Sequence, residues 1–121
     1  MKFGYVVLYV NSVDSSLEFW IERVGMVEKG RNQVGPFSIV KVGFSDQEFA
    51  FELVPLELMK DNPDNLDLAT PSIAFYVSNL KEVREGLMAK EVEVSEIANH
   101  SGISTFGFSD NESHWFAVLE S

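Results

Sequence analysis

The sequence predicts an α+β fold in which one module, a strand followed by a helix and three more strands, occurs twice in tandem. Two strand-like segments, Tyr5–Val10 and Ser72–Val77, are rich in β-branched and aromatic residues, and each precedes a helix-like segment. The tetrapeptide Gly-Phe-Ser-Asp also recurs, at Gly43–Asp46 and at Gly107–Asp110. Because strands and tetrapeptides recur at a similar offset, we expect two equivalent βαβββ modules.

In the first module, the opening strand leads to Ser12, which can cap a helix over Val13–Val24 that ends at Gly25. The module closes with a strand over Glu48–Val54. Helical spacing predicts that the helix buries one apolar face, made of Val13, Leu17, Trp20 and Ile21.

In the second module, Asn79 and Glu82 have the spacing of a capping box at the start of a helix. The last strand is expected over His114–Leu119. The apolar residues expected on the buried face of this helix are Leu80, Val83 and Leu87.

Between the two modules, the segment Leu58–Pro71 is rich in Asp and Asn and is typical of a solvated linker. We therefore expect modules of about residues 1–56 and 69–121. A chain of 121 residues has the usual size of one domain, so the two modules are expected to form a single domain over residues 1–121.

Composition narrows the range of partners and compartments. The net charge of −10 repels phosphate backbones, which argues against nucleic acid and favours neutral or cationic partners. The absence of cysteine excludes disulfides, thiol catalysis and cysteine-based metal sites. No apolar stretch approaches the roughly 18 residues of a membrane span, and no cleavable leader is recognisable, so we expect a cytoplasmic protein that does not bind membranes.

The order of these motifs resembles that of the vicinal oxygen chelate superfamily, which includes glyoxalase I, extradiol dioxygenases, fosfomycin resistance enzymes and bleomycin resistance proteins. The resemblance covers nearly the whole chain. It rests on the first strand with the helix motif Ser-Leu-Glu-Phe-Trp, on Pro71–Val77, and on the turn Phe108–His114 before the last strand. It implies two mixed sheets curled around a shared cavity, and a homodimer in which a second chain closes that cavity.

The resemblance also identifies four strand positions at which the superfamily's metal enzymes place their ligands. Three of these positions hold Tyr5, Ser72 and Ala117, and only Glu52 keeps a carboxylate. Because a methyl group cannot coordinate a metal, we expect neither a metal nor another cofactor. His100 is expected in a solvated loop, and His114 is expected to face away from the cavity.

Strand alternation sorts the side chains that would face this cavity. Four aromatic residues would form its walls, and Glu52 would be its polar anchor, because an inward carboxylate needs a cation, a hydrogen-bonding ligand or water. Two other interpretations remain: the aromatic residues merely fill the cavity, or a displaced register exposes Glu52. The predicted ligand-binding residues are Tyr5, Tyr9, Glu52, Ser72, Tyr76, Trp115 and Ala117.

Three functions are compatible with these features. The first is a metal-free protein of the bleomycin-resistance type that sequesters a cationic aromatic compound, such as an antibiotic, without altering it; no catalytic residue is then expected. The second is a metal-dependent lyase or dioxygenase with a shifted metal site built from Glu48, Glu52, His100 or His114. The third is a regulatory or assembly role in which the fold serves as a dimerisation module.

Overall fold

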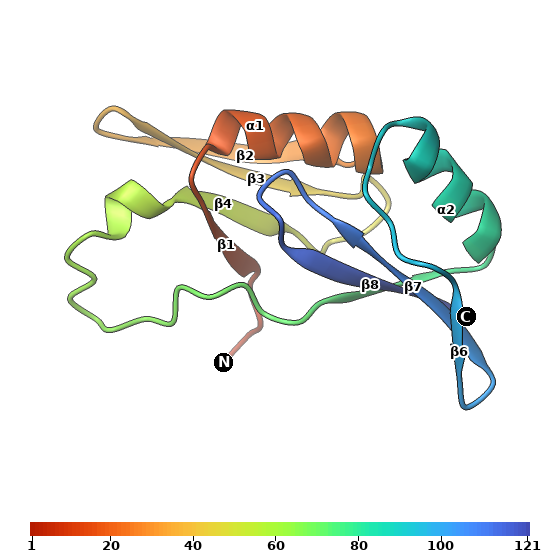
Figure 1. Ribbon diagram of the computed structural model, residues 1–121. Coiled ribbons are helices and arrows are strands. Elements are labelled where there is room, and N and C mark those ends of the chain that lie inside the picture. The colour runs from red at the N-terminus through yellow and green to blue at the C-terminus, as the bar shows by residue number, and fades with distance from the viewer. The chain divides into compact units, whose positions relative to one another are not determined.

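The computed structural model describes residues 1–121 and contains two compact units, Met1–Thr70 and Pro71–Ser121. Each unit has the element order strand, helix and three strands, and each forms its own four-stranded sheet (Figure 1). The predicted α+β fold with two tandem βαβββ modules is therefore confirmed. No helix is long and apolar enough to span a membrane.

The sheet of the first unit has the strand order β1-β4-β3-β2. Strands β1 and β4 are parallel, and the other two pairs are antiparallel. Its elements are β1 (Val6–Val10), α1 (Val13–Glu18), the π-helical segment η1 (Phe19–Val24), β2 (Val27–Val34), β3 (Phe37–Gly43), β4 (Phe51–Pro55) and the short 3-10 helix η2 (Leu56–Met59).

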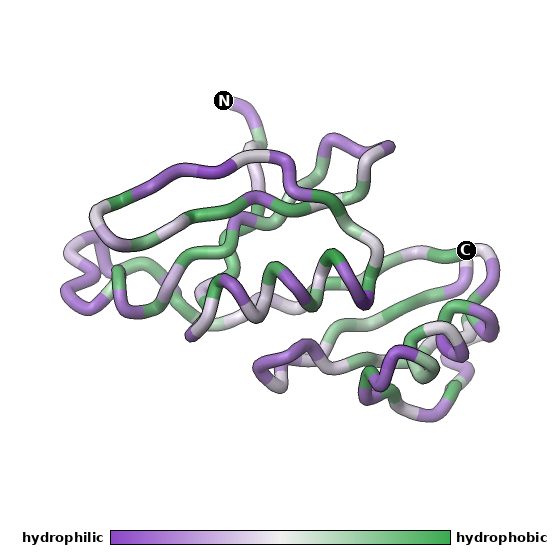
Figure 2. The backbone as a smooth tube through the Cα atoms, turned by 90° about the horizontal axis from the view of Figure 1, so that it is seen from above, coloured by the Kyte–Doolittle hydropathy of each residue, from purple (hydrophilic) through white to green (hydrophobic).

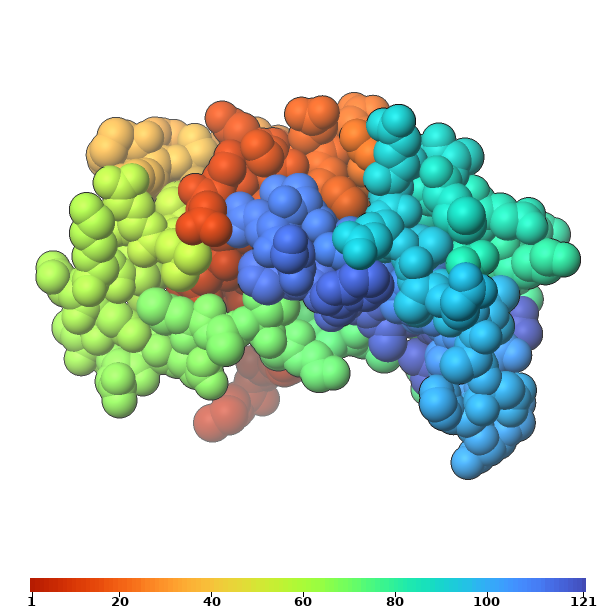
Figure 3. Space-filling view, viewed as in Figure 1, coloured from red at the N-terminus to blue at the C-terminus, as the bar shows by residue number.

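The sheet of the second unit has the corresponding order β5-β8-β7-β6, with β5 and β8 parallel. The tip of the β6–β7 hairpin is exposed and projects at the lower right of Figure 3. Its elements are β5 (Ala74–Val77), α2 (Leu80–Ala89), β6 (Ala98–His100), β7 (Ile103–Ser109) and β8 (Trp115–Glu120). Every strand of the second unit thus has a counterpart in the first.

Each unit has an apolar core on one face of its sheet. Alternate strand residues point to this face, and hydrophobic and hydrophilic residues alternate along the helices in Figure 2. Trp20 is fully buried and packs edge-on against Phe51, with 5.1 Å between ring centroids. In the second unit, Phe108 and Phe116 stack with 5.5 Å between their centroids.

The first helix begins and ends as predicted but changes its winding in the middle. The Ser12 hydroxyl accepts a hydrogen bond from the Ser15 amide at 3.2 Å, and the helix ends at Gly25, whose φ of 94° suits glycine. Because the π-helical segment has more residues per turn, the apolar face shifts along the helix. The buried side chains are Val13, Ser16, Phe19 and Trp20, whereas Leu17 and Ile21, predicted to be buried, are only half-buried.

The capping box predicted at the start of the second helix is not formed. The Asn79 side chain makes no hydrogen bond to the helix backbone; it donates instead to the Glu82 carboxylate at 3.3 Å. The Leu80 amide donates at 3.1 Å to the carboxylate of Glu120, which is near in space but distant in sequence. A strand residue therefore caps this helix. Leu80 and Leu87 are buried as predicted, and Val83 is half-buried.

The repeated tetrapeptide does not mark equivalent positions. Gly43 is the last residue of β3, whereas Gly107 lies in the middle of β7, directly opposite Ala117. The residue opposite Glu52, the counterpart of Ala117, is Lys41. The two tetrapeptides are therefore out of register, and the tandem relation rests on the strand pairing alone.

Candidate ligand-binding groove

The second sheet has one open face, opposite its apolar core. On β8, Trp115, Ala117 and Leu119 point to this face, while Phe116 and Val118 are buried on the other. On the neighbouring segment, Ser72, Ala74 and Tyr76 are exposed on the same side, because Ala74 pairs with Ala117 and Tyr76 pairs with Leu119. Aromatic and small residues therefore share the open face.

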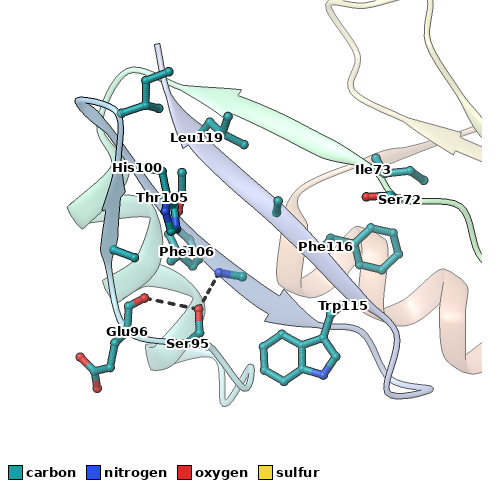
Figure 4. A pocket seen from close by; sticks show the side chains of 14 residues that line it. Ser72, Ile73, Ser95, Glu96, His100, Thr105, Phe106, Trp115, Phe116 and Leu119 are labelled. Carbon is teal, nitrogen blue, oxygen red and sulfur yellow. Dashed lines mark hydrogen bonds between the residues drawn. The ribbon is translucent and has the colours of Figure 1, made fainter.

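A groove of about 580 Å³ lies on this face (Figure 4). This volume falls within the roughly 300–1,000 Å³ of ordinary small-molecule sites. His100 and Thr105 lie toward one end of the groove in the figure, and Trp115 lies toward the other. The groove is lined by Ser72, Ile73, Ser95, Glu96, Ala98, His100, Ile103, Thr105, Phe106, Gly107, Trp115, Phe116, Ala117 and Leu119.

Two small residues, Gly107 and Ala117, face each other across β7 and β8 and form the floor of the groove. A Cβ atom added to Gly107 would lie 3.4 Å from Cε3 of Trp115 and 3.4 Å from the carbonyl oxygen of Phe116. Gly107 therefore lets the Trp115 indole lie close to the sheet. Trp115 is 49% exposed, and its indole presents a flat apolar surface to the groove.

One rim of the groove is held by hydrogen bonds around Ser95. The Ser95 hydroxyl accepts from the Gly107 amide at 2.8 Å (Figure 4). The Ser95 amide also donates to the Gly107 carbonyl at 2.8 Å. Nε of Arg84, on α2, donates to the Ser95 carbonyl at 2.8 Å. Glu96, the next residue, is exposed and lies 3.9 Å from the Arg84 guanidinium. Helix α2 thus positions this rim of the groove.

Three of the predicted binding residues, Ser72, Trp115 and Ala117, line this groove. Tyr76 lies on the same face of the sheet and is 75% exposed, but it is not part of the lining. The prediction for His100 was wrong: it ends β6 and lines the groove. The turn of the hairpin is formed by the next two residues, Ser101 and Gly102, which both have positive φ angles. The Ser-Gly dipeptide was a turn signal that could have placed His100 at a strand end.

The other predicted residues, Tyr5, Tyr9 and Glu52, belong to the first unit. Glu52 is half-buried on the open face of the first sheet, and the strand register places Lys41 directly opposite. Nζ of Lys41 lies 4.1 Å from the centroid of the Tyr5 ring, a cation–π contact. No sequence motif marks Lys41 as the neighbour of Glu52. Because this lysine brings a positive charge to the same face, Glu52 does not require a cation from outside the chain.

The residues do not fit a metal ion. Ala117 offers a methyl group at a position where the superfamily's metal enzymes have a carboxylate, and Ala74 faces it across the strands. No group of three His, Cys, Asp or Glu side chains could hold a metal. Glu48, part of the alternative shifted site, lies in the loop before β4 and not in the strand as predicted.

His114 has a structural partner close in sequence. Its Nδ1 lies 3.3 Å from Oδ2 of Asp110, whose side chain is only 3% exposed. The other carboxylate oxygen of Asp110 accepts hydrogen bonds from the amides of Glu112 and His114 at 2.8 and 2.9 Å. Asp110 and His114 therefore close the turn before β8.

The comparisons with known proteins agree with this architecture. No protein-family model and no curated protein sequence matches the chain. Solved structures match over the whole chain, however, at low sequence identity.

UcmS2 is 20% identical, with 100% of this chain and 98% of that one covered and a TM-score of 0.82. A member of the glyoxalase/bleomycin resistance protein/dioxygenase superfamily from Sphaerobacter thermophilus DSM 20745 is 17% identical, with 100% and 98% covered and a TM-score of 0.83. TnmS3, an antibiotic binding protein from Streptomyces sp. CB03234, is 14% identical, with 99% and 98% covered and a TM-score of 0.78. The chain therefore has the fold of this superfamily, as its sequence motifs predicted.

Proposed function

We propose that this protein binds a planar aromatic small molecule, preferentially a cationic one such as an antibiotic, without a metal and without altering it. The observation that carries the proposal is the groove on the second sheet. It combines a suitable volume, a floor of two small residues and an exposed indole at one end. A flat ring can lie on the Gly107–Ala117 floor and contact Trp115, which removes apolar surface from water.

The preference for a cation rests on charge. The net charge of −10 attracts cations over distances of about a Debye length and raises their association rate. At the rim of the groove, Glu96 adds an exposed carboxylate to this acidic surface. The similarity in fold to TnmS3, an antibiotic binding protein, supports the same class of ligand.

The proposed binding residues remain those predicted from the sequence, together with His100 and Glu96 of the groove. Of these residues, Tyr5, Tyr9 and Glu52 lie on the open face of the first sheet. We further propose a homodimer in the cytoplasm. Light scattering should then give a mass of twice 13.6 kDa at micromolar concentration, and a mass of 13.6 kDa would contradict the dimer.

Calorimetric titration with proflavine, a planar cation, tests the proposed function. We expect wild-type protein to bind it at one site per chain, and Trp115→Ala to weaken binding by at least tenfold because the aromatic wall is lost. Met88→Ala is the matched control, since Met88 is also about half exposed but lies on α2, outside the groove. Equal affinities of the three proteins, or no binding of any planar probe, would refute the proposal.

A further inference from the structure

The open face of the first sheet carries two opposite charges at its centre. Lys41 on β3 and Glu52 on β4 are paired across the strands, so their side chains point to the same side. Both residues are half-buried. Neither side chain forms a hydrogen bond or a salt bridge, and the only contact of the Lys41 ammonium is the Tyr5 ring.

The fold does not need these charges. In the second sheet, the equivalent pair consists of Gly107 and Ala117, and the strand pairing is the same. Partly burying an ammonium and a carboxylate without hydrogen bonds costs free energy, because both groups lose water. Two such groups side by side on an open face present hydrogen-bonding positions that a ligand can complete.

The surroundings of Lys41 hold its ammonium in place. On the strand next to β3, its neighbour Gly30 has no side chain, and a Cβ atom there would lie 4.0 Å from Cδ of Lys41. On its other side, the ammonium lies over the Tyr5 ring. The cation–π contact orients the ammonium but satisfies none of its three N–H donors by a hydrogen bond.

We propose that Lys41 and Glu52 form a polar subsite for an uncharged group that both accepts and donates hydrogen bonds, such as a carboxamide or lactam on an aromatic ligand. The carbonyl oxygen accepts from the Lys41 ammonium, and the N–H donates to the Glu52 carboxylate. An anion would be repelled by Glu52 and a cation by Lys41, so a neutral dipolar group suits the pair best. This subsite belongs to the first unit alone and rests on the proposed function, since it assumes an aromatic ligand.

Four acridines that differ only at ring position 9 test the subsite: unsubstituted acridine, the 9-carboxamide, the 9-carboxylate and 9-aminoacridine, which is a cation. For the wild type, we expect the carboxamide to bind at least fivefold more tightly than acridine. Lys41→Met should abolish this preference and strengthen binding of 9-aminoacridine. Glu52→Gln should weaken binding of 9-aminoacridine and strengthen that of the carboxylate.

The matched controls are Lys60→Met and Glu57→Gln, which change the same charges in an exposed ion pair of 3.6 Å at η2. They should leave the ratios between the four affinities unchanged within twofold, and thermal unfolding should show that all variants are folded. If none of the acridines binds, both the proposed function and the subsite fail. If the acridines bind but the Lys41 and Glu52 variants keep the wild-type ratios, the subsite alone fails.

Discussion

The two modules share one strand topology but differ at the centre of their open faces. In the first sheet, Lys41 and Glu52 face each other; in the second, Gly107 and Ala117 occupy the equivalent pair. The second sheet has a groove there, and Trp115 lies against its floor. The same strand arrangement thus carries a polar pair in one sheet and an apolar groove in the other, and the difference lies in the two residues paired at the centre of each open face.

The comparison teaches that the two sheets keep the same apolar face and differ on the open face, where we propose that ligands bind. The core faces of both sheets are apolar and closely packed, as the stacked rings of Phe108 and Phe116 show. The open faces are free to vary because their residues are not needed for packing. This division leads to four predictions, in order of decreasing effect.

Adjacent residues of β8 should separate stability from binding. Phe116 is 2% exposed and stacks in the core, so Phe116→Ala should lower the free energy of unfolding by about 3–5 kcal/mol. Trp115→Ala, on the open face, should lower it by less than about 1 kcal/mol while weakening proflavine binding. Urea unfolding measures both changes. Similar losses of stability in the two variants would mean that the faces are not divided in this way.

Filling the floor of the groove on the second sheet should abolish its ability to bind a flat ring. Ala117→Leu places a larger side chain where a ligand ring would lie, so proflavine affinity should fall by at least tenfold, about 1.4 kcal/mol. The control Ala89→Leu adds the same atoms at the exposed end of α2. Calorimetry should show unchanged affinity for the control; unchanged affinity for Ala117→Leu would place the ligand elsewhere.

Helix α2 should depend on the cap that the structure shows and not on the one that the sequence predicted. Helix α2 depends on Glu120 of β8, so Glu120→Ala should lower the free energy of unfolding by about 1 kcal/mol. Glu82→Ala removes the residue that was expected to complete a capping box. It should lower the free energy of unfolding by only a few tenths of that amount, because Glu82 hydrogen-bonds to the Asn79 side chain and not to the helix backbone. Thermal or urea unfolding distinguishes these outcomes. A larger loss of unfolding free energy from Glu82→Ala than from Glu120→Ala would show that the predicted capping box, and not Glu120, stabilises the helix.

Removing metal ions should change neither the ligand affinity nor the stability of the protein. Because neither open face brings together three metal-binding side chains, dialysis against a chelator should leave proflavine affinity and the unfolding midpoint unchanged. Elemental analysis of the untreated protein provides the control. If the protein holds a stoichiometric metal and its removal abolishes binding, the metal-dependent lyase or dioxygenase becomes the better hypothesis.

The features that the sequence predicted correctly, strand faces and helix ends, depend on the spacing of residues close together in the chain. Strand alternation assigned Trp115 and Ala117 to the open face, and Ser12 and Gly25 marked the ends of the first helix. These features follow from neighbouring residues along the chain.

The features that the sequence analysis missed depend on pairing between distant segments. The Glu120 cap joins residues that are 40 positions apart, and Lys41 could be recognised as the neighbour of Glu52 only from the register of β3 against β4. The tetrapeptide repeat misled the alignment of the two modules for the same reason, because strand register is set by pairing and not by identical letters.

The central claim, that the groove beside Trp115 binds a planar ligand, can be tested directly with the two indole N–H signals of the protein in nuclear magnetic resonance. Trp20 is fully buried in the core of the first unit, whereas Trp115 is 49% exposed at the groove, so each spectrum contains its own control. On titration with proflavine, we predict that the Trp115 signal shifts and saturates while the Trp20 signal keeps its position. Saturable binding by calorimetry with an unmoved Trp115 signal would contradict the claim.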